Sequence, residues 1–295
     1  MLQQTPVARV EPVWRAWMTR WPGPADLAAA GTADVLVAWS GLGYPRRALR
    51  LQECSRVVMD RHGGHVPVAE DDLRALPGVG EYTAAAVRAF AHGRRSVVVD
   101  TNVRRVLARV IGGEAQAAPS YTRAERDRAA AVVPGGDAEA AHWSVAVMEL
   151  GALVCTARSP ACGRCPVADR CAWRAAGYPP DAHGARRRTQ GWAGTDRQAR
   201  GRMMAVLRTA FAAGESSVPE ERLLAAGAEV FAAAPARTAR TEEGAIAAGR
   251  AGGAEAARER THRVLAGLVA DGLAARGNGS DPGSLSLPGV GPGDD

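Results

Sequence analysis

The chain has 295 residues, 46% of them hydrophobic, with a formal net charge of +6 and a pI near 9.5. This length allows two domains, or one domain with an appendage. No apolar run approaches the ~18 residues of a membrane-spanning helix, and no signal peptide is recognisable, so we expect a soluble, cytoplasmic protein that binds no membrane. The basic balance suits a polyanionic partner. All 37 basic residues other than histidine are arginine.

Helix-forming residues dominate while Ile, Phe and Tyr are scarce, which favours an all-α fold. Apolar periodicity and Gly/Pro turns divide the first part of the chain into short helices. The predicted helices are residues 7–20, 33–40, 45–61, 70–75, 82–91, 102–110, 121–133 and 138–150.

The second part of the chain is expected to be a smaller unit. We assign residues 1–178 to the core, 179–196 to a basic linker, and 197–290 to a small winged-helix-like region. A low-complexity insertion at 231–258 interrupts that region. The order of its elements is a helix with the stripe Met203, Met204, Leu207 and Phe211, a short strand, two helices and a hairpin. The alternative interpretation is a poorly ordered, alanine-rich extension.

Four cysteines carry the strongest chemical signal in the sequence. Cys155, Cys162, Cys165 and Cys171 follow the spacing C-x6-C-x2-C-x5-C. Four thiolates so close in sequence suit one metal centre better than two disulfides, and this spacing favours a [4Fe–4S] cluster. Zinc more often uses two close pairs, and a zinc knuckle is the alternative. Arg158 and Arg164 lie in the same loop, which predicts a surface that contacts phosphate.

Leu76-Pro77-Gly78-Val79-Gly80 lies between two predicted helices. Gly78 and Gly80 allow a sharp turn that presents backbone N–H groups, including that of Val79, at the start of the next helix. A helix N-terminus of this kind binds anions, so a helix-hairpin-helix motif that holds a DNA phosphate is predicted. The alternative is an ordinary connection between helices.

Residues 97–102, Val-Val-Val-Asp-Thr-Asn, place a carboxylate after an apolar run and before a helix. An isolated Asp at this position is most often an N-cap. The cap and a chemical role are compatible, because a capping carboxylate is held rigidly and stays ionised.

In this order, these features resemble the helix-hairpin-helix DNA glycosylases that carry an iron–sulfur cluster, the family of endonuclease III and the adenine glycosylases. The resemblance covers roughly residues 1–178. Residues 1–7, Met-Leu-Gln-Gln-Thr-Pro-Val, and 41–44, Gly-Leu-Gly-Tyr, are similar to elements of the adenine glycosylases. The resemblance implies a six-helix barrel, a helical cluster domain and a monomer that acts on double-stranded DNA with an A:8-oxoguanine or A:G mismatch.

The resemblance also implies roles for individual residues. Gln4 and Tyr44 would wedge the DNA beside the flipped base, and Leu42 of the same turn would contact DNA. Asp100 would stabilise the oxocarbenium-like sugar, with Tyr82 in the base pocket and Asn102 orienting phosphate or water. Members that cleave the strand use a lysine just after the hairpin glycines. Tyr82 stands there and the chain has no lysine, so strand cleavage is disfavoured.

Two departures from the family affect the prediction. The family's general acid is a glutamate two positions before the first residue of this sequence, so we expect the natural chain to start further upstream. Glu11 and Glu81 do not match that position. The C-terminal region also lacks the strand-rich pattern of the domain that reads 8-oxoguanine. The alternative functions are a DNA-binding protein that recognises damage without catalysis, or a glycosylase for another mismatched base.

Overall fold

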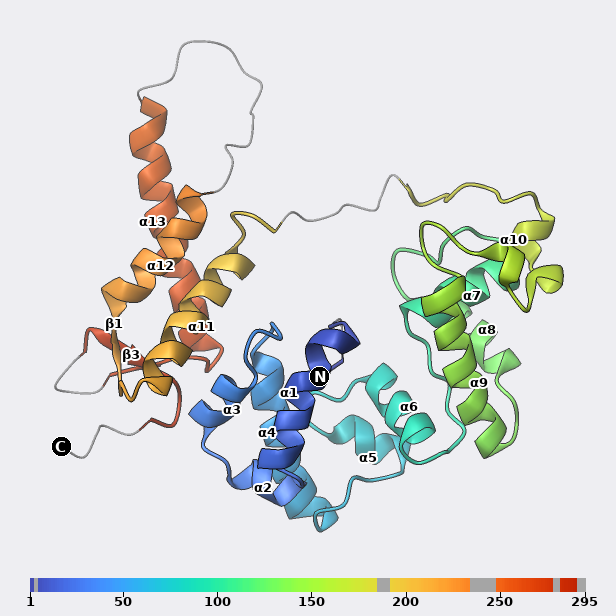
Figure 1. The fold of residues 1–295 in the computed structure, drawn as a ribbon, viewed down its shortest axis with the longest axis horizontal. Coiled ribbons are helices and arrows are strands. Elements are labelled where there is room, and N and C mark those ends of the chain that lie inside the picture. The colour runs from blue at the N-terminus through green and yellow to red at the C-terminus, as the bar shows by residue number, and fades with distance from the viewer. Residues whose placement is uncertain (3–4, 185–191, 234–247, 278–281, 291–295) are drawn as a thin grey trace. The chain divides into compact units, whose positions relative to one another are not determined.

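The computed structural model describes residues 1–2, 5–184, 192–233, 248–277 and 282–290. It divides into two compact units, one formed by Met1–His65 with Gln190–Asp295 and the other by Val66–Thr189. The described residues are mostly helical, which confirms the predicted all-α class, and the strands among them are short (Figure 1). No helix in these ranges is long and apolar enough to cross a membrane.

The first unit combines the start and the end of the chain. Its elements are α1 (Val7–Arg20), α2 (Pro24–Ala29), α3 (Thr32–Ala38), α4 (Arg46–His62), α11 (Asp196–Ala212), β1 (Val218–Pro219), α12 (Glu220–Ala232), α13 (Ala248–Ala270), β2 (Ala275–Arg276) and β3 (Ser284–Ser286). Sequence periodicity did not predict α2, because six residues are too few to show a pattern. Pro24 at its first position and a hydrogen bond from Gly23 N–H to the Asp26 carboxylate (3.0 Å) start this helix.

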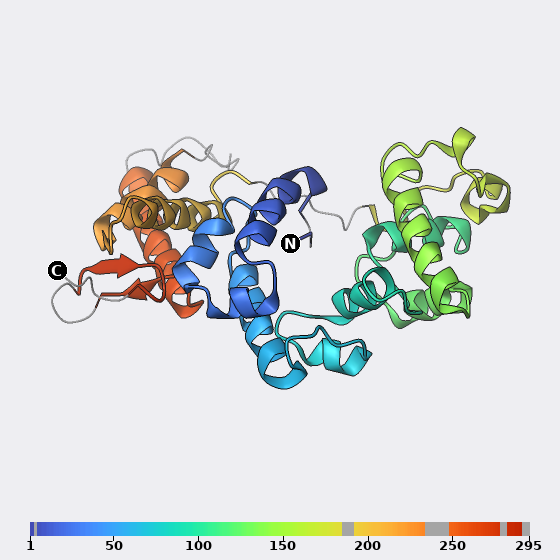
Figure 2. The same ribbon diagram turned by 60° about the horizontal axis from the view of Figure 1, so that its bottom comes forward.

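The C-terminal region has the predicted order of helix, strand, two helices and two strands. The strands form a small antiparallel sheet, part of which is drawn as red arrows near the C-terminus in Figure 2. Their order is β1-β3-β2, and Val218 pairs with Leu285 and Ala275 with Ser286. The predicted hairpin turn at 278–279, most of the insertion and part of the linker lie outside the described residues. Helices α12 and α13 extend into the predicted insertion from both sides.

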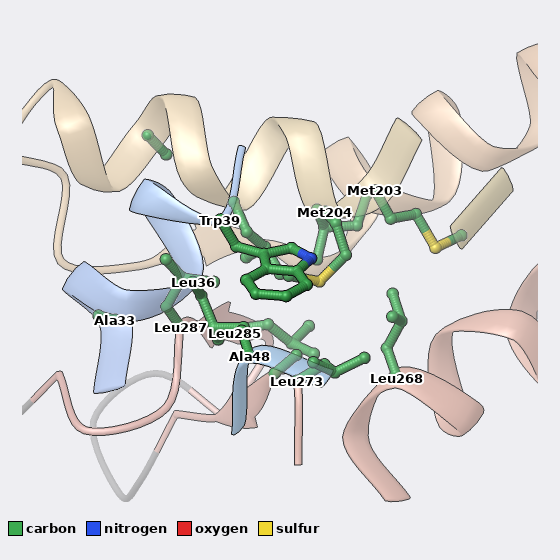
Figure 3. Packing of buried hydrophobic residues seen from close by; sticks show 14 of the residues in the cluster. Ala33, Leu36, Trp39, Ala48, Met203, Met204, Leu268, Leu273, Leu285 and Leu287 are labelled. Carbon is green, nitrogen blue, oxygen red and sulfur yellow. The ribbon is translucent and has the colours of Figure 1, made fainter. Parts of the chain in front are cut away.

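The N-terminal helices and the C-terminal region share one hydrophobic core, which the sequence did not predict. Leu36 and Trp39, at and just after the end of α3, belong to the same buried cluster as Met204 of α11, Leu268 of α13 and Leu285 of β3 (Figure 3). Trp17 adds an edge-to-face contact with Trp39 at 5.6 Å between ring centroids. The C-terminal region therefore stabilises the first unit from within, because removing it would expose this core to water.

The second unit contains the hairpin and the cysteines. Its elements are α5 (Glu70–Ala75), α6 (Glu81–Phe90), α7 (Thr101–Val110), α8 (Arg123–Val132), α9 (Asp137–Glu149), the π-helical turn η1 (Leu150–Val154), the short 3-10 turns η2 (Cys162–Arg164) and η3 (Ala168–Arg170), and α10 (Ala172–Ala175). Local caps fix several of these boundaries. Thr122 and Glu125 form a reciprocal capping box, which starts α8 two residues later than predicted.

Candidate active site and metal centre

The turn between α5 and α6 exposes backbone where a phosphate would fit. Gly78 has a left-handed φ of 78°, which glycine adopts without strain, and Val79 N–H closes the turn on the Leu76 carbonyl at 3.1 Å. Gly80 is the N-cap residue of α6 and has no side chain to cover the first N–H groups of that helix. The space beside it is open, since a Cβ added there would meet no atom within 4 Å. A ligand can thus approach the N-terminus of α6, where the helix dipole favours an anion.

Asp100 begins α7 and is held through both of its carboxylate oxygens. Oδ1 accepts a hydrogen bond from Val103 N–H at 2.7 Å, and Oδ2 accepts one from the Asn102 side-chain amide at 2.9 Å. The half-buried carboxylate is thus an N-cap, as one interpretation of the sequence expected. The two bonds fix its orientation, which a chemical role would also require.

Tyr82 lies in the first turn of α6, and its side chain is 38% exposed. Burial raises the pKa of its phenol, and the negative charge of Asp100 raises that pKa further. The phenol is therefore neutral at pH 7 and able to donate a hydrogen bond. The second unit thus brings Tyr82, Asp100 and Asn102, the predicted catalytic residues, into one neighbourhood.

A buried arginine, which sequence reasoning missed, supports this neighbourhood. Arg105 of α7 is 7% exposed and donates to Asn102 Oδ1 (2.8 Å), to the Gly151 carbonyl (2.6 Å) and to the Cys155 carbonyl (2.7 Å). The hydrogen bonds run without a break from Asp100 through Asn102 and Arg105 to the first cysteine of the loop. The sequence signal was present, because Arg105 and Arg109 are four residues apart on the apolar face of α7.

Arg109 lies one turn further along α7 and is 2% exposed. Its guanidinium donates to Cys155 Sγ at 3.3 Å and to the Thr156 carbonyl at 2.8 Å, and it lies 4.6 Å from the ring centroid of Trp173. Positive charge and hydrogen bonds of this kind stabilise thiolate sulfur and tune an iron–sulfur centre. The local chemistry therefore suits an anionic cluster.

All four predicted cysteine ligands line one open cavity. Cys155 directly follows η1, Cys162 begins η2 and Cys165 follows it, and Cys171 directly precedes α10. Within the described ranges, no group of three or more His, Cys, Asp or Glu side chains is placed to hold a single metal ion. Zinc needs its sulfurs about 2.3 Å from one ion, whereas the cysteines of a cubane cluster each ligate a different iron and stand further apart. The arrangement fits a cluster better than a zinc knuckle.

Arg158 and Arg164, the predicted phosphate contacts of the loop, are both exposed. Arg164 donates to the Leu153 carbonyl at 3.3 Å, which anchors one side of its guanidinium. The structure therefore places positive charge on the solvent-facing side of the cysteine loop.

The predicted wedge element lies in the first unit. Gln4 lies outside the described residues. Leu42 is only 5% exposed and packs in the core, and its predicted contact with DNA stays a prediction.

Tyr44, by contrast, is 44% exposed and has a left-handed φ of 48°. A non-glycine residue held there stores about 1–3 kcal/mol of strain, which such residues carry most often at functional sites. Two hydrogen bonds hold the turn, one from Trp39 Nε1 to the Gly43 carbonyl (2.9 Å) and one from Arg9 to the Gly41 carbonyl (2.6 Å).

Comparison with known proteins agrees with this geometry. Residues 1–131 match the family described as HhH-GPD superfamily base excision DNA repair protein, and residues 155–171 match the iron-sulfur binding domain of endonuclease III. These matches define a helix-hairpin-helix DNA glycosylase with an iron–sulfur cluster. A solved structure of a thermostable thymine-DNA glycosylase aligns with a TM-score of 0.53 at 27% identity, covering 59% of this chain and 80% of the other. A non-covalent endonuclease III–DNA complex aligns at 0.52 and 26%, covering 60% and 80%.

The adenine DNA glycosylase of Mycobacterium tuberculosis is 56% identical over 211 residues, which are 71% of this chain and 68% of the relative. The chain therefore belongs to the adenine DNA glycosylases. It is a base excision repair glycosylase, a hydrolase of N-glycosyl bonds, with a DNA-binding fold and a [4Fe–4S] cluster as its cofactor.

Proposed function

We propose that this protein removes adenine mispaired with 8-oxoguanine or guanine by hydrolysing its N-glycosidic bond, without cleaving the strand. The observation that carries this proposal is the carboxylate of Asp100, fixed through both oxygens beside a neutral Tyr82, in a chain that contains no lysine. A Schiff-base mechanism of strand cleavage needs a side-chain amine, and Tyr82 offers none.

Recognition begins with the DNA backbone. The exposed backbone of the Gly78–Val79–Gly80 turn, which the Val79 N–H bond to the Leu76 carbonyl holds in shape, binds a phosphate near the lesion, and the exposed Arg158 and Arg164 contact further phosphates. The duplex bends and the adenine leaves the stack, which costs a few kcal/mol. Tyr44 occupies the disturbed base step, as apolar and aromatic wedges do in other bent duplexes.

The chemical step develops positive charge on the sugar as the base departs. The carboxylate of Asp100 stabilises that charge, and it needs no reorganisation because Val103 and Asn102 already hold it. Tyr82 offers a neutral donor to the pocket. Asn102, itself held by Arg105, orients the water or phosphate nearby.

The cluster would be held by Cys155, Cys162, Cys165 and Cys171. When bound, it supplies rigidity to the arginine-bearing loop. The chain's own contribution is the positive charge of Arg109 against Cys155 Sγ and the Arg105 bridge from that loop to Asn102.

Glu11 and Glu81 do not match the predicted acid position in the sequence, and both are engaged elsewhere. Glu11 pairs with Arg15 at 2.8 Å on the outer face of α1, and Glu81 pairs with Arg126 at 3.1 Å. We therefore assign neither as the general acid that protonates adenine.

A second candidate is a glycosylase for another mismatched base, which the structural similarity to a thymine-DNA glycosylase favours. Single-turnover assays with matched duplexes distinguish the candidates. The duplexes carry adenine opposite 8-oxoguanine, adenine opposite guanine, thymine opposite guanine, or adenine opposite thymine as the control. We expect base release only from the two duplexes with mismatched adenine. The strand should break only after treatment with alkali. Light scattering should show one protein chain bound to each duplex.

The Asp100→Asn variant should lose at least ~100-fold in excision rate, since the charge that stabilises the transition state is removed. The matched control is Asp127→Asn, an exposed carboxylate with a long contact to Arg123 (3.7 Å), which should leave the rate unchanged. Release of thymine but not adenine would establish the second candidate. Tight binding to the mismatch without release of any base would show a binding protein instead.

A further inference from the structure

We propose that Arg197, at the start of the C-terminal region, positions the wedge residue Tyr44 together with Trp192 and binds the DNA phosphate next to the wedged base step. This inference rests on the proposed function, in which Tyr44 enters the duplex. It makes the C-terminal region part of the DNA-binding surface of the first unit.

The observation is a stack of three side chains. The Arg197 guanidinium carbon lies 4.1 Å from the ring centroid of Tyr44 and 5.3 Å from that of Trp192. Both rings are exposed, Tyr44 by 44% and Trp192 by 56%. A guanidinium over aromatic faces orients the rings, while its N–H donors remain in its own plane.

Backbone contacts fix both sides of the stack. The turn before Tyr44 is held by the Trp39 hydrogen bond to the Gly43 carbonyl. On the other side, the Thr195 hydroxyl donates to the Trp192 carbonyl at 2.9 Å and accepts from Gln198 N–H as the cap of α11. Arg197 therefore joins two rigid points that are distant in the sequence.

The charge of Arg197 is not neutralised within the part of the chain that the structure describes. Its neighbour Asp196 pairs with Arg260 at 2.5 Å, and among the described residues no ion pair joins Arg197 to a carboxylate. A cation in the first turn of a helix is also disfavoured by the helix dipole. An exposed arginine kept there against the dipole suits an anionic ligand.

The chemistry of the stack identifies that ligand as duplex DNA. Two exposed rings suit the faces of unstacked bases, and a planar guanidinium suits a phosphate oxygen pair. Tyr44 adopts its left-handed φ at an energetic cost, and the Arg197 guanidinium over its ring holds that ring in place, as a wedge must be before the duplex arrives. Arg197 is thus a positioning residue for Tyr44 and a phosphate contact.

The experiment uses the full chain and a duplex with 2-aminopurine beside an adenine:8-oxoguanine pair. Fluorescence of 2-aminopurine reports unstacking, and anisotropy at several salt concentrations gives Kd and its salt slope. The variants are Arg197→Ala, Arg197→Lys and Trp192→Ala. The matched control is Arg202→Ala on the same helix. Arg202 makes only a long contact with Glu229 (3.9 Å), and the side chains of both residues are exposed.

For Arg197→Ala we expect Kd to rise about 10-fold, the salt slope to fall by about one, and the 2-aminopurine signal at saturation to drop. Arg197→Lys should restore the slope but not the full signal, because lysine keeps the charge and loses the planar stack. Trp192→Ala should reduce the signal and leave the slope. Thermal melting that matches the control excludes misfolding as the cause.

The inference is overturned if Arg197→Ala behaves like Arg202→Ala in slope and signal while the wild-type chain unstacks and excises. It is also overturned if Arg197→Lys recovers nothing and Arg197→Ala melts early, since the role would then be structural. A wild-type chain that neither unstacks nor excises at the mismatch would instead refute the proposed function, and this inference with it.

Discussion

Replacing Arg105 by glutamine tests whether the buried arginine links the cysteine loop to the candidate active site. Arg105 satisfies three acceptors, the carbonyls of Cys155 and Gly151 and the side-chain oxygen of Asn102. Glutamine is too short to reach all three. Each buried acceptor left unpaired costs about 1 kcal/mol or more, so the second unit should lose about 3 kcal/mol. At about 3 °C per kcal/mol, its melting temperature should fall by roughly 10 °C.

The same change should slow excision, because Asn102 loses the contact that holds it against Asp100. A misplacement of about 1 Å costs about 100-fold in rate, so we expect a loss between 10- and 100-fold in single-turnover excision. The control is Arg123→Gln in the same unit, an arginine 93% exposed with a 3.7 Å contact. At about 3 °C per kcal/mol, a difference of roughly 2 °C in melting temperature corresponds to about 0.7 kcal/mol. If Arg105→Gln melts within that difference of the control and excises at the same rate, the bridge is not functional.

Three further predictions concern the contact between Gly151 and Asn102, the core of the first unit, and the pH dependence of stability. Gly151→Ala should slow excision, because the added Cβ would lie 2.7 Å from Asn102 Cβ. The control is Gly163→Ala, whose added Cβ would meet no atom within 4 Å and should leave the excision rate unchanged. Equal excision rates for the two variants would contradict this prediction. Met204→Ala should destabilise the first unit by about 2–5 kcal/mol in denaturant titration, and a loss below 1 kcal/mol would argue against a shared core. Asp137 accepts from Arg95 N–H and Arg94, which lower its carboxyl pKa, so it stabilises the folded state above pH ~4 and this is lost as pH falls further. Asp137→Asn should therefore lower the melting temperature more at pH 7 than at pH 3, and an equal loss at both would refute that cause.

Several parts of the site were predictable because short-range geometry decides them. The glycines of residues 76–80 permit the left-handed turn, and Asp100 before α7 is a cap in any context that leaves the helix intact. The spacing of the cysteines likewise limits the metal centre to one loop. The ligand roles of these cysteines, and the roles of Tyr82, Asp100 and Asn102 in catalysis, stay predictions.

Other parts depended on contacts between distant segments. The exposure of Leu42 could not be judged from the Gly-Leu-Gly-Tyr sequence, because burial depends on which elements cover the turn. Arg105 and Arg109 lie on the apolar face of α7, but the carbonyls that they bind lie in a loop almost fifty residues later, so the pattern of α7 alone did not specify their partners. The Arg197 stack on Tyr44 was hidden for the same reason.

The sequence by itself determined the helical class, the hairpin, the cap and the cysteine loop, and with them the family. Each of these follows from backbone conformation or from ligand spacing within a few residues. The tertiary structure alone decided that residues 190–295 complete the core of residues 1–65, and that buried arginines connect the cysteine loop to Asn102. Burial and charge pairing arise only when distant segments meet, and the sequence pattern of each segment alone does not specify its partner.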